Sequence, residues 1–266
     1  NSTGSYNSAF GTGALGANTT GSTNSAFGAY ALGNNDDGYN NVAIGYSALS
    51  QNISGADNVA IGNSASYNNT GSGNVVIGAG ANQDATGQNN AVIIGFNSAQ
   101  GTNSGCVMIG NAVAAASNGG SSSVVIGDGA AANSPSITAS VIVGDNAYVD
   151  GTIAPSTSVI IGGGALGGYT TPTYGSPSIN TSVIIGAEAC GNGQNKINSL
   201  VAIGYQALYN VNGQALNGGD KTVAIGYQAF FSATNIAFGV AIGYQAGYSQ
   251  LSSGNLLCGF RAGYSN

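Results

Sequence analysis

The chain has 266 residues and a formal net charge of −6, and only three of its residues are lysine or arginine. Nucleic-acid binding needs many cations that displace phosphate counterions, so this composition excludes that class, and it disfavours an anionic membrane surface for the same reason. Glycine contributes 46 residues and charged residues only 5%, whereas 42% are hydrophobic. This balance is typical of a rigid extracellular or virion fibre, not of a cytosolic enzyme or a disordered segment.

The chain opens with a short phrase that recurs to its end. The copies at 7–11 and 24–28 are variants of the phrase at 41–45, Asn-Val-Ala-Ile-Gly. Alignment on the glycine gives fifteen copies with a spacing of about 17 residues, which predicts a solenoid with one coil per copy. We expect one continuous parallel β-solenoid over residues 1–266. It would have atypical opening coils at 1–40, regular coils at 41–161, coils with longer surface loops at 162–226 and closing coils at 227–266.

The recurring glycine stands at a fixed place, directly after three small or apolar residues. This indicates a bend or a positive-φ corner, which only glycine adopts without cost. The glycines expected to hold this structural position include Gly45, Gly62, Gly78, Gly95, Gly127, Gly204, Gly226 and Gly243. Alanine follows three residues later in thirteen of the fifteen copies, so we expect tight packing there, at a second short strand that turns back into the coil.

The three residues before each glycine predict a β-strand with two apolar faces. The first and third, usually Val and Ile, share one face, and the middle one points the other way. The middle residue is Ala in seven copies and bulkier in eight, and it is never polar. Both faces are therefore expected to be buried. We expect Val and Ile to fill the coil interior, and the middle residue to pack against identical chains around an axis.

Two late intervals are longer than the rest, at 24 and 22 residues. Insertions in a solenoid map to surface loops, so we expect loops at 163–182 and 205–221. They are the candidate surfaces for binding a glycan or protein, although bulges without a ligand are the alternative. The candidate binding residues are Tyr169, Thr171, Tyr174, Asn210 and Asn212.

The last coils carry an aromatic residue directly after the glycine. Because adjacent coils stack about 4.8 Å apart, these residues predict an aromatic ladder beside a glutamine ladder. We interpret both as structural. The aromatic row is Tyr205, Tyr227, Tyr244 and Phe260, and the second row is Gln206, Gln228, Gln245 and Arg261.

The chain offers little catalytic chemistry. It has no histidine, which excludes Ser-His-Asp and histidine–metal sites. Asp128 and Asp145 follow glycines of adjacent coils and would lie about 5 Å apart, the one pair that a glycan-cleaving enzyme or a cation site could use. Solvated ladder positions are the favoured interpretation, so we predict no enzyme, no catalytic residue, no metal site and no cofactor.

Two further patterns have simple interpretations. The three cysteines lie too far apart for a disulfide framework or a metal knuckle, and Cys258, in the slot usually held by Ile, is expected to be a small buried thiol. The N-glycosylation pattern occurs at Asn18, Asn52, Asn68 and Asn180. It is expected by chance in a chain so rich in Asn, Ser and Thr. No apolar run approaches the ~20 residues of a membrane helix.

The phrase Asn-Val-Ala-Ile-Gly-x-x-Ala/Ser resembles the head repeat of YadA-like trimeric autotransporter adhesins. Its longer form at 200–209, with Asn-Thr-Thr-Gly at 18–21, also resembles repeats of bacteriophage tail fibres, notably those of marine and cyanobacterial phages. The resemblance covers nearly all of the chain. It implies a left-handed β-roll assembled as a parallel homotrimer that works in attachment. The coils are longer than those of YadA-like heads, and alanine often replaces the terminal serine.

On this resemblance we expect a structural and adhesive segment of a phage tail fibre, located in the virion. Multivalent binding to a host-surface glycan or protein receptor would be its mechanism. The alternative is the head of a bacterial trimeric adhesin on the cell surface that binds matrix or neighbouring cells. The expected partners are two further copies of the chain and the receptor, with no nucleic acid and no membrane insertion in this segment. An ice-binding solenoid is disfavoured because irregular intervals spoil a flat threonine surface.

Overall fold

The computed structural model describes residues 3–114, 120–134, 136–148, 155–166, 179–191, 197–210, 221–233 and 236–265. Within these ranges the protein is all-β, has no helix and folds as a parallel β-solenoid. It divides into two compact units, Asn1–Ile126 and Gly127–Asn266.

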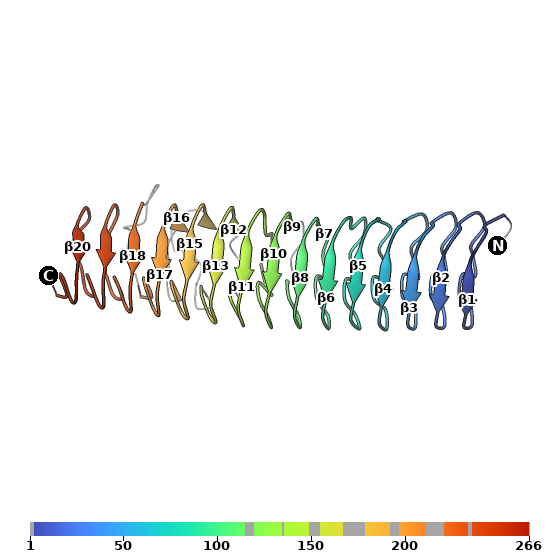
Figure 1. Cartoon of the computed structure of the whole chain (residues 1–266), viewed down its shortest axis with the longest axis horizontal. Helices are drawn as coiled ribbons and strands as arrows, with labels where there is room; N and C mark the ends of the chain where they lie inside the picture. Colours follow the sequence, from blue (N-terminus) through green and yellow to red (C-terminus); the bar gives the residue numbers. More distant parts are fainter. Residues whose placement is uncertain are drawn as a thin grey trace. The chain divides into compact units, whose positions relative to one another are not determined.

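The N-terminal unit is built on a column of three-residue strands that lie side by side in chain order (Figure 1). Each strand pairs in parallel with the next and in register, so that Val42 lies opposite Val59 and Ala43 opposite Ala60. Two shorter strands, β7 (Asn103–Ser104) and β9 (Gly120–Ser121), form a second small sheet. The main column contains β1 (Ser8–Phe10), β2 (Ser25–Phe27), β3 (Val42–Ile44), β4 (Val59–Ile61), β5 (Val75–Ile77), β6 (Val92–Ile94), β8 (Val107–Ile109) and β10 (Val124–Ile126).

The C-terminal unit repeats this plan. Its register is again strict, with Ala224 opposite both Ala202 and Ala241. A second sheet joins β12 (Pro155–Ser156), β14 (Ile179–Asn180) and β16 (Ile197–Asn198). The main column contains β11 (Val141–Val143), β13 (Val159–Ile161), β15 (Val183–Ile185), β17 (Val201–Ile203), β18 (Val223–Ile225), β19 (Val240–Ile242) and β20 (Leu256–Cys258).

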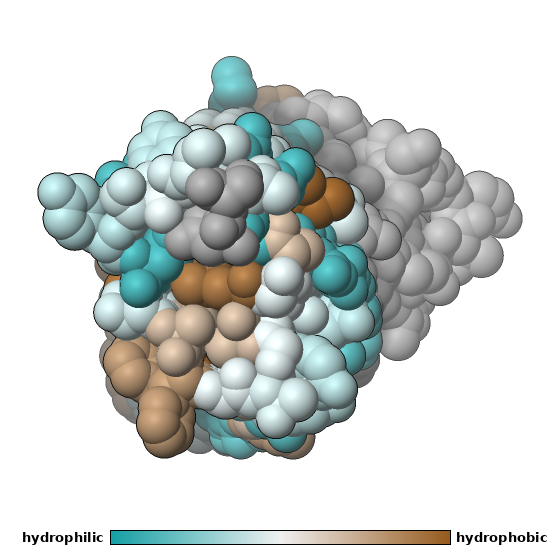
Figure 2. All heavy atoms as spheres, turned by 90° about the vertical axis from the view of Figure 1, so that its right-hand side faces the viewer, coloured by the Kyte–Doolittle hydropathy of each residue, from teal (hydrophilic) through white to brown (hydrophobic). Residues whose placement is uncertain are grey.

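The strands bury their middle residue inside the coil, which reverses the orientation predicted above. Ala43, Ile93 and Met108 are fully buried, whereas the first and third residues of their strands are half-buried or exposed. Val and Ile therefore point outward. The prediction was wrong because all three positions are apolar, so the alternation of side chains does not say which face is inside. Figure 2, which faces the end at which β1 lies, shows apolar residues in the centre of the coil and others that reach the surface, most of them at the lower left.

The middle residue shares the coil interior with the residue four places after the glycine. The two positions meet directly in the last coil, where a methyl group on Gly263 would lie 2.9 Å from Cδ1 of Leu257. Their sizes are often complementary, since a small middle residue goes with a large partner and a large one with a small partner. Examples are Ala43 with Leu49 and Ala202 with Leu208, against Ile93 with Ala99 and Met108 with Ala114, all buried. The coil at 142–148, with both Ile142 and Tyr148 buried, is an exception.

The residues after the glycine form turns, and the second short strand lies elsewhere than predicted. In the coil at 45–49 the N–H of Ala48 donates to the carbonyl of Gly45 at 3.4 Å, while Ser47 and Leu49 have left-handed φ values of 54° and 51°. The buried alanine fits this tight turn, but the small second sheets precede the main strands instead of following the glycine. At the alanine the chain reverses its direction through turns, without the second strand that was predicted there.

Candidate functional site

Within each unit the recurring glycines form a column in which each one touches the next. Gly45 has a φ of +132°, and a methyl group on it would lie 2.4 Å from the carbonyl oxygen of Gly62. The same positive φ and the same approach to the next glycine recur at Gly62, Gly78, Gly95, Gly127, Gly204, Gly226 and Gly243, where the shortest such distance is between 1.8 and 2.6 Å. Only glycine fits this position, because the φ value is unfavourable for other residues and because no space is left for a side chain. These residues are structural and leave no room for a ligand.

A buried ladder of amides precedes the strands of the N-terminal unit. Asn41 donates from Nδ2 to the carbonyl of Gly55 at 2.8 Å, and its Oδ1 accepts the backbone N–H of Asn58 at 3.1 Å. In the C-terminal unit serine takes the same place, and the N–H of Ser182 donates to Oγ of Ser158 at 3.3 Å. These ladders satisfy backbone groups inside the coil. Two asparagines of the N-glycosylation pattern, Asn18 and Asn52, are likewise buried and closed to a glycan.

The aromatic ladder predicted from the last coils is present. The rings of Tyr205 and Tyr227 stack with centroids 5.3 Å apart, and the stack continues through Tyr244 to Phe260 at 5.1 and 5.3 Å. Beside it, Gln228 donates to Gln206 at 2.8 Å and Gln245 donates to Gln228 at 2.9 Å. At the two ends of the row Gln206 donates to Glu188 and Arg261 donates to Gln245.

A second aromatic ladder is formed by residues five places after the glycines. It was not predicted from the sequence. Tyr209, Phe231, Tyr248 and Tyr264 stack with centroids 5.4, 5.0 and 4.9 Å apart. Its signal was the recurrence of an aromatic residue four places after each member of the first ladder. The inner rings of both ladders are stacked on both faces and present no free ring face to a ligand. At the C-terminal end, the Arg261 guanidinium lies 5.5 Å from the ring centre of Phe260 and 4.9 Å from that of Tyr264.

The carboxylate at the head of the glutamine row affects its surroundings. The negative charge of Glu188 is the main cause that raises the pKa of the Tyr205 phenol, with a smaller contribution from burial.

The cysteines offer little reactive chemistry. Cys106 and Cys190 are buried, and desolvation raises the pKa of Cys190 to about 12. Cys258 is exposed, contrary to the prediction, because the Ile slot points outward.

Most of the candidate binding residues lie outside the described ranges. This holds for Tyr169, Thr171, Tyr174 and Asn212. Asn210 is described: it is half-buried, and its N–H donates to the carbonyl of Phe231 at 2.7 Å as a rung between adjacent coils. Its backbone therefore has a structural role.

The aspartate pair is open to solvent. Asp128 and Asp145 are both exposed, and Asn146 joins them, since its N–H donates to the Asp128 carbonyl at 2.8 Å and its Nδ2 donates to Oδ1 of Asp145 at 3.0 Å. Within the described ranges no cluster of three or more His, Cys, Asp or Glu side chains could hold a metal ion. The geometry fits solvated ladder positions.

Within each unit the outward Val and Ile side chains make an apolar strip, which we call the Val/Ile stripe. In the N-terminal unit it consists of the first and third residues of β3 to β6, β8 and β10, and in the C-terminal unit of the same residues of β11, β13, β15 and β17 to β19. Ile44 is 40% exposed and Ile242 41%. The stripe is two side chains wide within each unit, and β-branched residues hold it almost without interruption.

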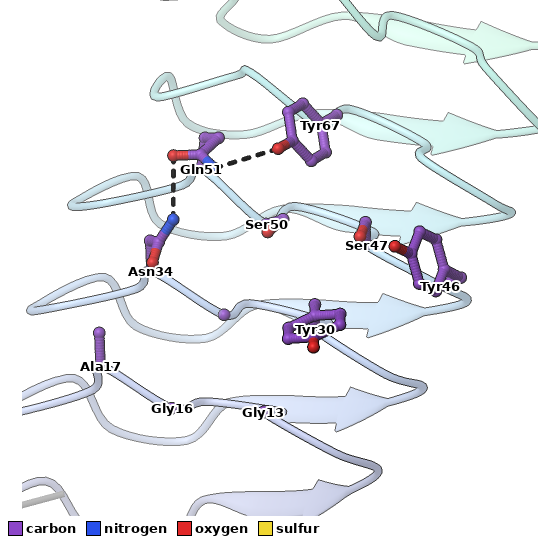
Figure 3. Close-up of a pocket in the computed structure, with 11 residues that line it drawn as sticks. Gly13, Gly16, Ala17, Tyr30, Asn34, Tyr46, Ser47, Ser50, Gln51 and Tyr67 are labelled. Atoms are coloured by element: carbon purple, nitrogen blue, oxygen red, sulfur yellow. Dashed lines mark hydrogen bonds between the residues drawn. The ribbon is translucent and has the colours of Figure 1, made fainter.

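A groove of about 500 Å³ lies on the turn side of the N-terminal unit (Figure 3). Tyr30 and Tyr46 lie at one side of it and Asn34 and Gln51 at the other, and Tyr67 of the next coil lies beside Gln51. Asn34 donates from Nδ2 to Oε1 of Gln51 at 3.0 Å, and Gln51 donates from Nε2 to the hydroxyl of Tyr67 at 3.3 Å. These contacts link three coils through one chain of polar groups.

The groove exists because small residues stand where aromatic residues stand in the second ladder. Five places after the glycine, the first three coils carry Gly16, Gly33 and Ser50, and only the fourth carries an aromatic residue, Tyr67. No sequence motif predicts the groove, because it arises from the small size of the side chains at these positions.

Comparison with protein-family models, with curated proteins and with solved structures finds no significant match. Among the described residues, no helix has the length and apolar character that a membrane span requires.

Proposed function

We propose that the chain is a structural and adhesive fibre segment that assembles as a parallel homotrimer and mediates attachment of a phage to its host. The Val/Ile stripe carries this proposal. Parallel sheets are normally covered on both faces, and a long exposed apolar strip on a soluble protein marks an interface. Here the inner face is covered by the coil itself, and the outer face needs a partner.

A second copy of the chain fits this need better than an unrelated partner. Every strand of the stripe presents Val or Ile at both outward positions, so copies placed side by side in the same direction match it coil by coil. Closed rotational symmetry would cover the stripe on every copy at once. The number three, the left-handed coil and the count of fifteen coils follow the resemblance and the glycine spacing, and they belong to the proposal.

Attachment follows from this assembly. A rigid trimer repeats each surface feature three times, and weak sites that bind together reach high avidity without any new contact. The low charge and the backbone ladders suit a stiff extracellular element on a virion. The head of a bacterial adhesin would assemble in the same way, so the identity of the particle that carries the chain separates the two functions. Virions that carry the chain and lose host adsorption when it is deleted would support the fibre.

Light scattering at several protein concentrations tests the assembly. We expect three times the chain mass of 25.8 kDa for the wild type. Ile44→Glu combined with Ile61→Glu places charges in the Val/Ile stripe and should lower the mass or prevent folding. Tyr39→Glu, at a residue that is 50% exposed and outside the stripe, is the control and should remain trimeric.

A second measurement keeps the test decisive if the double variant does not fold. An assembly stabilised by association unfolds at a temperature that rises with protein concentration. A wild-type chain that is folded, monomeric and unaffected by concentration would overturn the proposal.

A further inference from the structure

We propose that the groove beside Tyr30, Tyr46 and Tyr67 binds a short neutral oligosaccharide. This inference rests on the proposed adhesive function and assigns it a site and a ligand class. The groove lies on the turn side of the coils, whereas the assembly is proposed to use the outward face of the strands, so both can operate together.

The tyrosines of the groove offer ring faces that the inner rings of the ladders do not. Tyr30 and Tyr46 meet edge to face, with centroids 6.1 Å apart and planes at 86°, and they are 48% and 55% exposed. The Tyr227–Tyr244 pair is instead parallel at 6°. An edge-to-face pair cannot cover both ring faces, so an aromatic surface remains open to a ligand. The C–H face of a sugar ring is a suitable partner for such a surface.

The opposite side of the groove supplies directional polar groups. Asn34 donates from Nδ2 to Gln51, and the side-chain oxygen Oδ1 of Asn34 makes no hydrogen bond to another described residue. Gln51 uses Oε1 and one Nε2 proton, which leaves a second proton on Nε2. An acceptor and a donor therefore stand a short distance apart on side chains already held in place by one another. Sugar hydroxyls, which both donate and accept, can use this pair.

The composition of the groove favours a neutral ligand. Its lining consists of Gly, Ala, Ser, Asn, Gln and Tyr, with no charged and no large aliphatic residue. Tyrosine combined with Ser, Gly and Asn is also the composition of recognition surfaces that combine rigid aromatic contacts with adaptable hydrogen bonds. Without a cation the groove has nothing to pair with a phosphate or carboxylate, and without aliphatic pockets it has little to hold peptide side chains.

The size of the groove fits a short chain of sugars. Its volume lies within the range of ordinary ligand sites. Its lining comes from four successive coils, which span about 14 Å at the usual strand spacing. This length exceeds a single sugar ring, so we expect affinity to rise from monosaccharide to oligosaccharide.

The test uses the full chain and a panel of neutral tetrasaccharides, namely maltotetraose, cellotetraose and N-acetylchitotetraose, followed by a wider array of neutral glycans. Binding is measured by saturation-transfer NMR and titration calorimetry. Tyr46→Ala and Gln51→Ala should each weaken binding about tenfold, because each removes one contact of ordinary strength. Tyr39→Ala, in the same unit and equally exposed but outside the groove, should change affinity less than about twofold.

A filling variant separates loss of the site from loss of the fold. Ser50→Tyr places an aromatic residue in the slot that Tyr67 occupies one coil later, so the coil should accept it while the groove closes. We expect unchanged assembly mass and no saturation transfer. Binding that survives Ser50→Tyr would overturn the assignment.

The remaining outcomes also distinguish the two proposals. If no neutral glycan binds while the wild type is trimeric and still adheres to cells, the ligand class is wrong and the proposed function stands. Binding of an acidic glycan or a peptide alone would overturn the inference in the same way. A chain that binds the tetrasaccharide but is a stable monomer would support the groove and contradict the assembly.

Discussion

The ring of Phe230 lies against Gly247 of the following coil, where an added methyl group would lie 2.5 Å from Cε1 of that ring. Gly247 also has a left-handed φ of +62°. Gly247→Ala should therefore lower the stability by about 1–3 kcal/mol through overpacking, in addition to a backbone cost near 1 kcal/mol. Urea unfolding at fixed protein concentration measures the loss. Gly254→Ala is the control, because its φ is +74° but nothing lies within 4 Å, and an equal loss in both variants would contradict the packing argument.

The glycine column should tolerate no side chain inside the stack. A methyl group on Gly62 would lie 2.6 Å from the carbonyl carbon of Gly78, and the φ of +139° belongs to a region that is almost exclusive to glycine. We expect Gly62→Ala to cost more than about 4 kcal/mol and to prevent soluble expression at 37 °C. Gly259→Ala should cost much less, since its φ is similar at +122° but no atom lies within 4 Å. Circular dichroism and thermal melting compare the two, and similar melting temperatures would refute the close stacking.

The buried asparagine ladder predicts a graded response at Asn41. Asn41→Ala leaves the buried Asn58 N–H without its acceptor, which should cost about 1–3 kcal/mol. It also removes one of two side-chain donors to the Gly55 carbonyl, which keeps its 2.9 Å hydrogen bond from Nδ2 of Asn52. Asn41→Ser should cost less, because a hydroxyl accepts the N–H of the next coil in the Ser158–Ser182 rung. Denaturant midpoints for the two variants check the order, and the reverse order would mean that packing volume outweighs the hydrogen bonds.

The buried thiol of Cys190 predicts a stability loss at alkaline pH. Its pKa rises from an ordinary value near 9 to about 12, so between these values the unfolded chain gives up a proton that the folded chain keeps. Stability is then complete below pH 9 and falls as the pH rises toward 12, with a slope approaching 1.4 kcal/mol per pH unit. Cys190→Ala removes this contribution while the tyrosines titrate as before. The difference between the two unfolding curves should widen only above pH 9, and parallel curves would contradict the burial.

Much of the fold was visible in the sequence. The spacing of Gly45, Gly62 and their successors predicted one coil per copy in a β-solenoid, and the rows beginning at Tyr205 and Gln206 predicted two ladders that the structure contains. In a repeat of nearly fixed length, equivalent residues of adjacent coils lie one above the other. A residue type that recurs at one position therefore predicts a contact between adjacent coils.

The inside of the coil was not predicted correctly, although the residues carried a signal. Ala43 occurs with Leu49, and Ile93 with Ala99, and this exchange of volume indicates that the middle residue shares a cavity with a residue of the following turn. Considered alone, Val-Ala-Ile gives no such direction because all three side chains are apolar. The groove near Tyr46 was more difficult to predict, because Gly16 and Gly33 lack the aromatic side chain that the last coils carry at the same position.

The shared cavity also restricts how the chain can vary. A larger residue at Ala43 alone would meet Leu49, and a smaller one at Leu49 alone would leave a void, so either single change is penalised while the pair Ala43→Ile with Leu49→Ala conserves the filling. Substitutions in the interior are therefore expected in coupled pairs, within one coil as here or between adjacent coils, as at Phe230 and Gly247. Homologous chains should show these two columns covarying, and the glycine column between them should stay constant throughout.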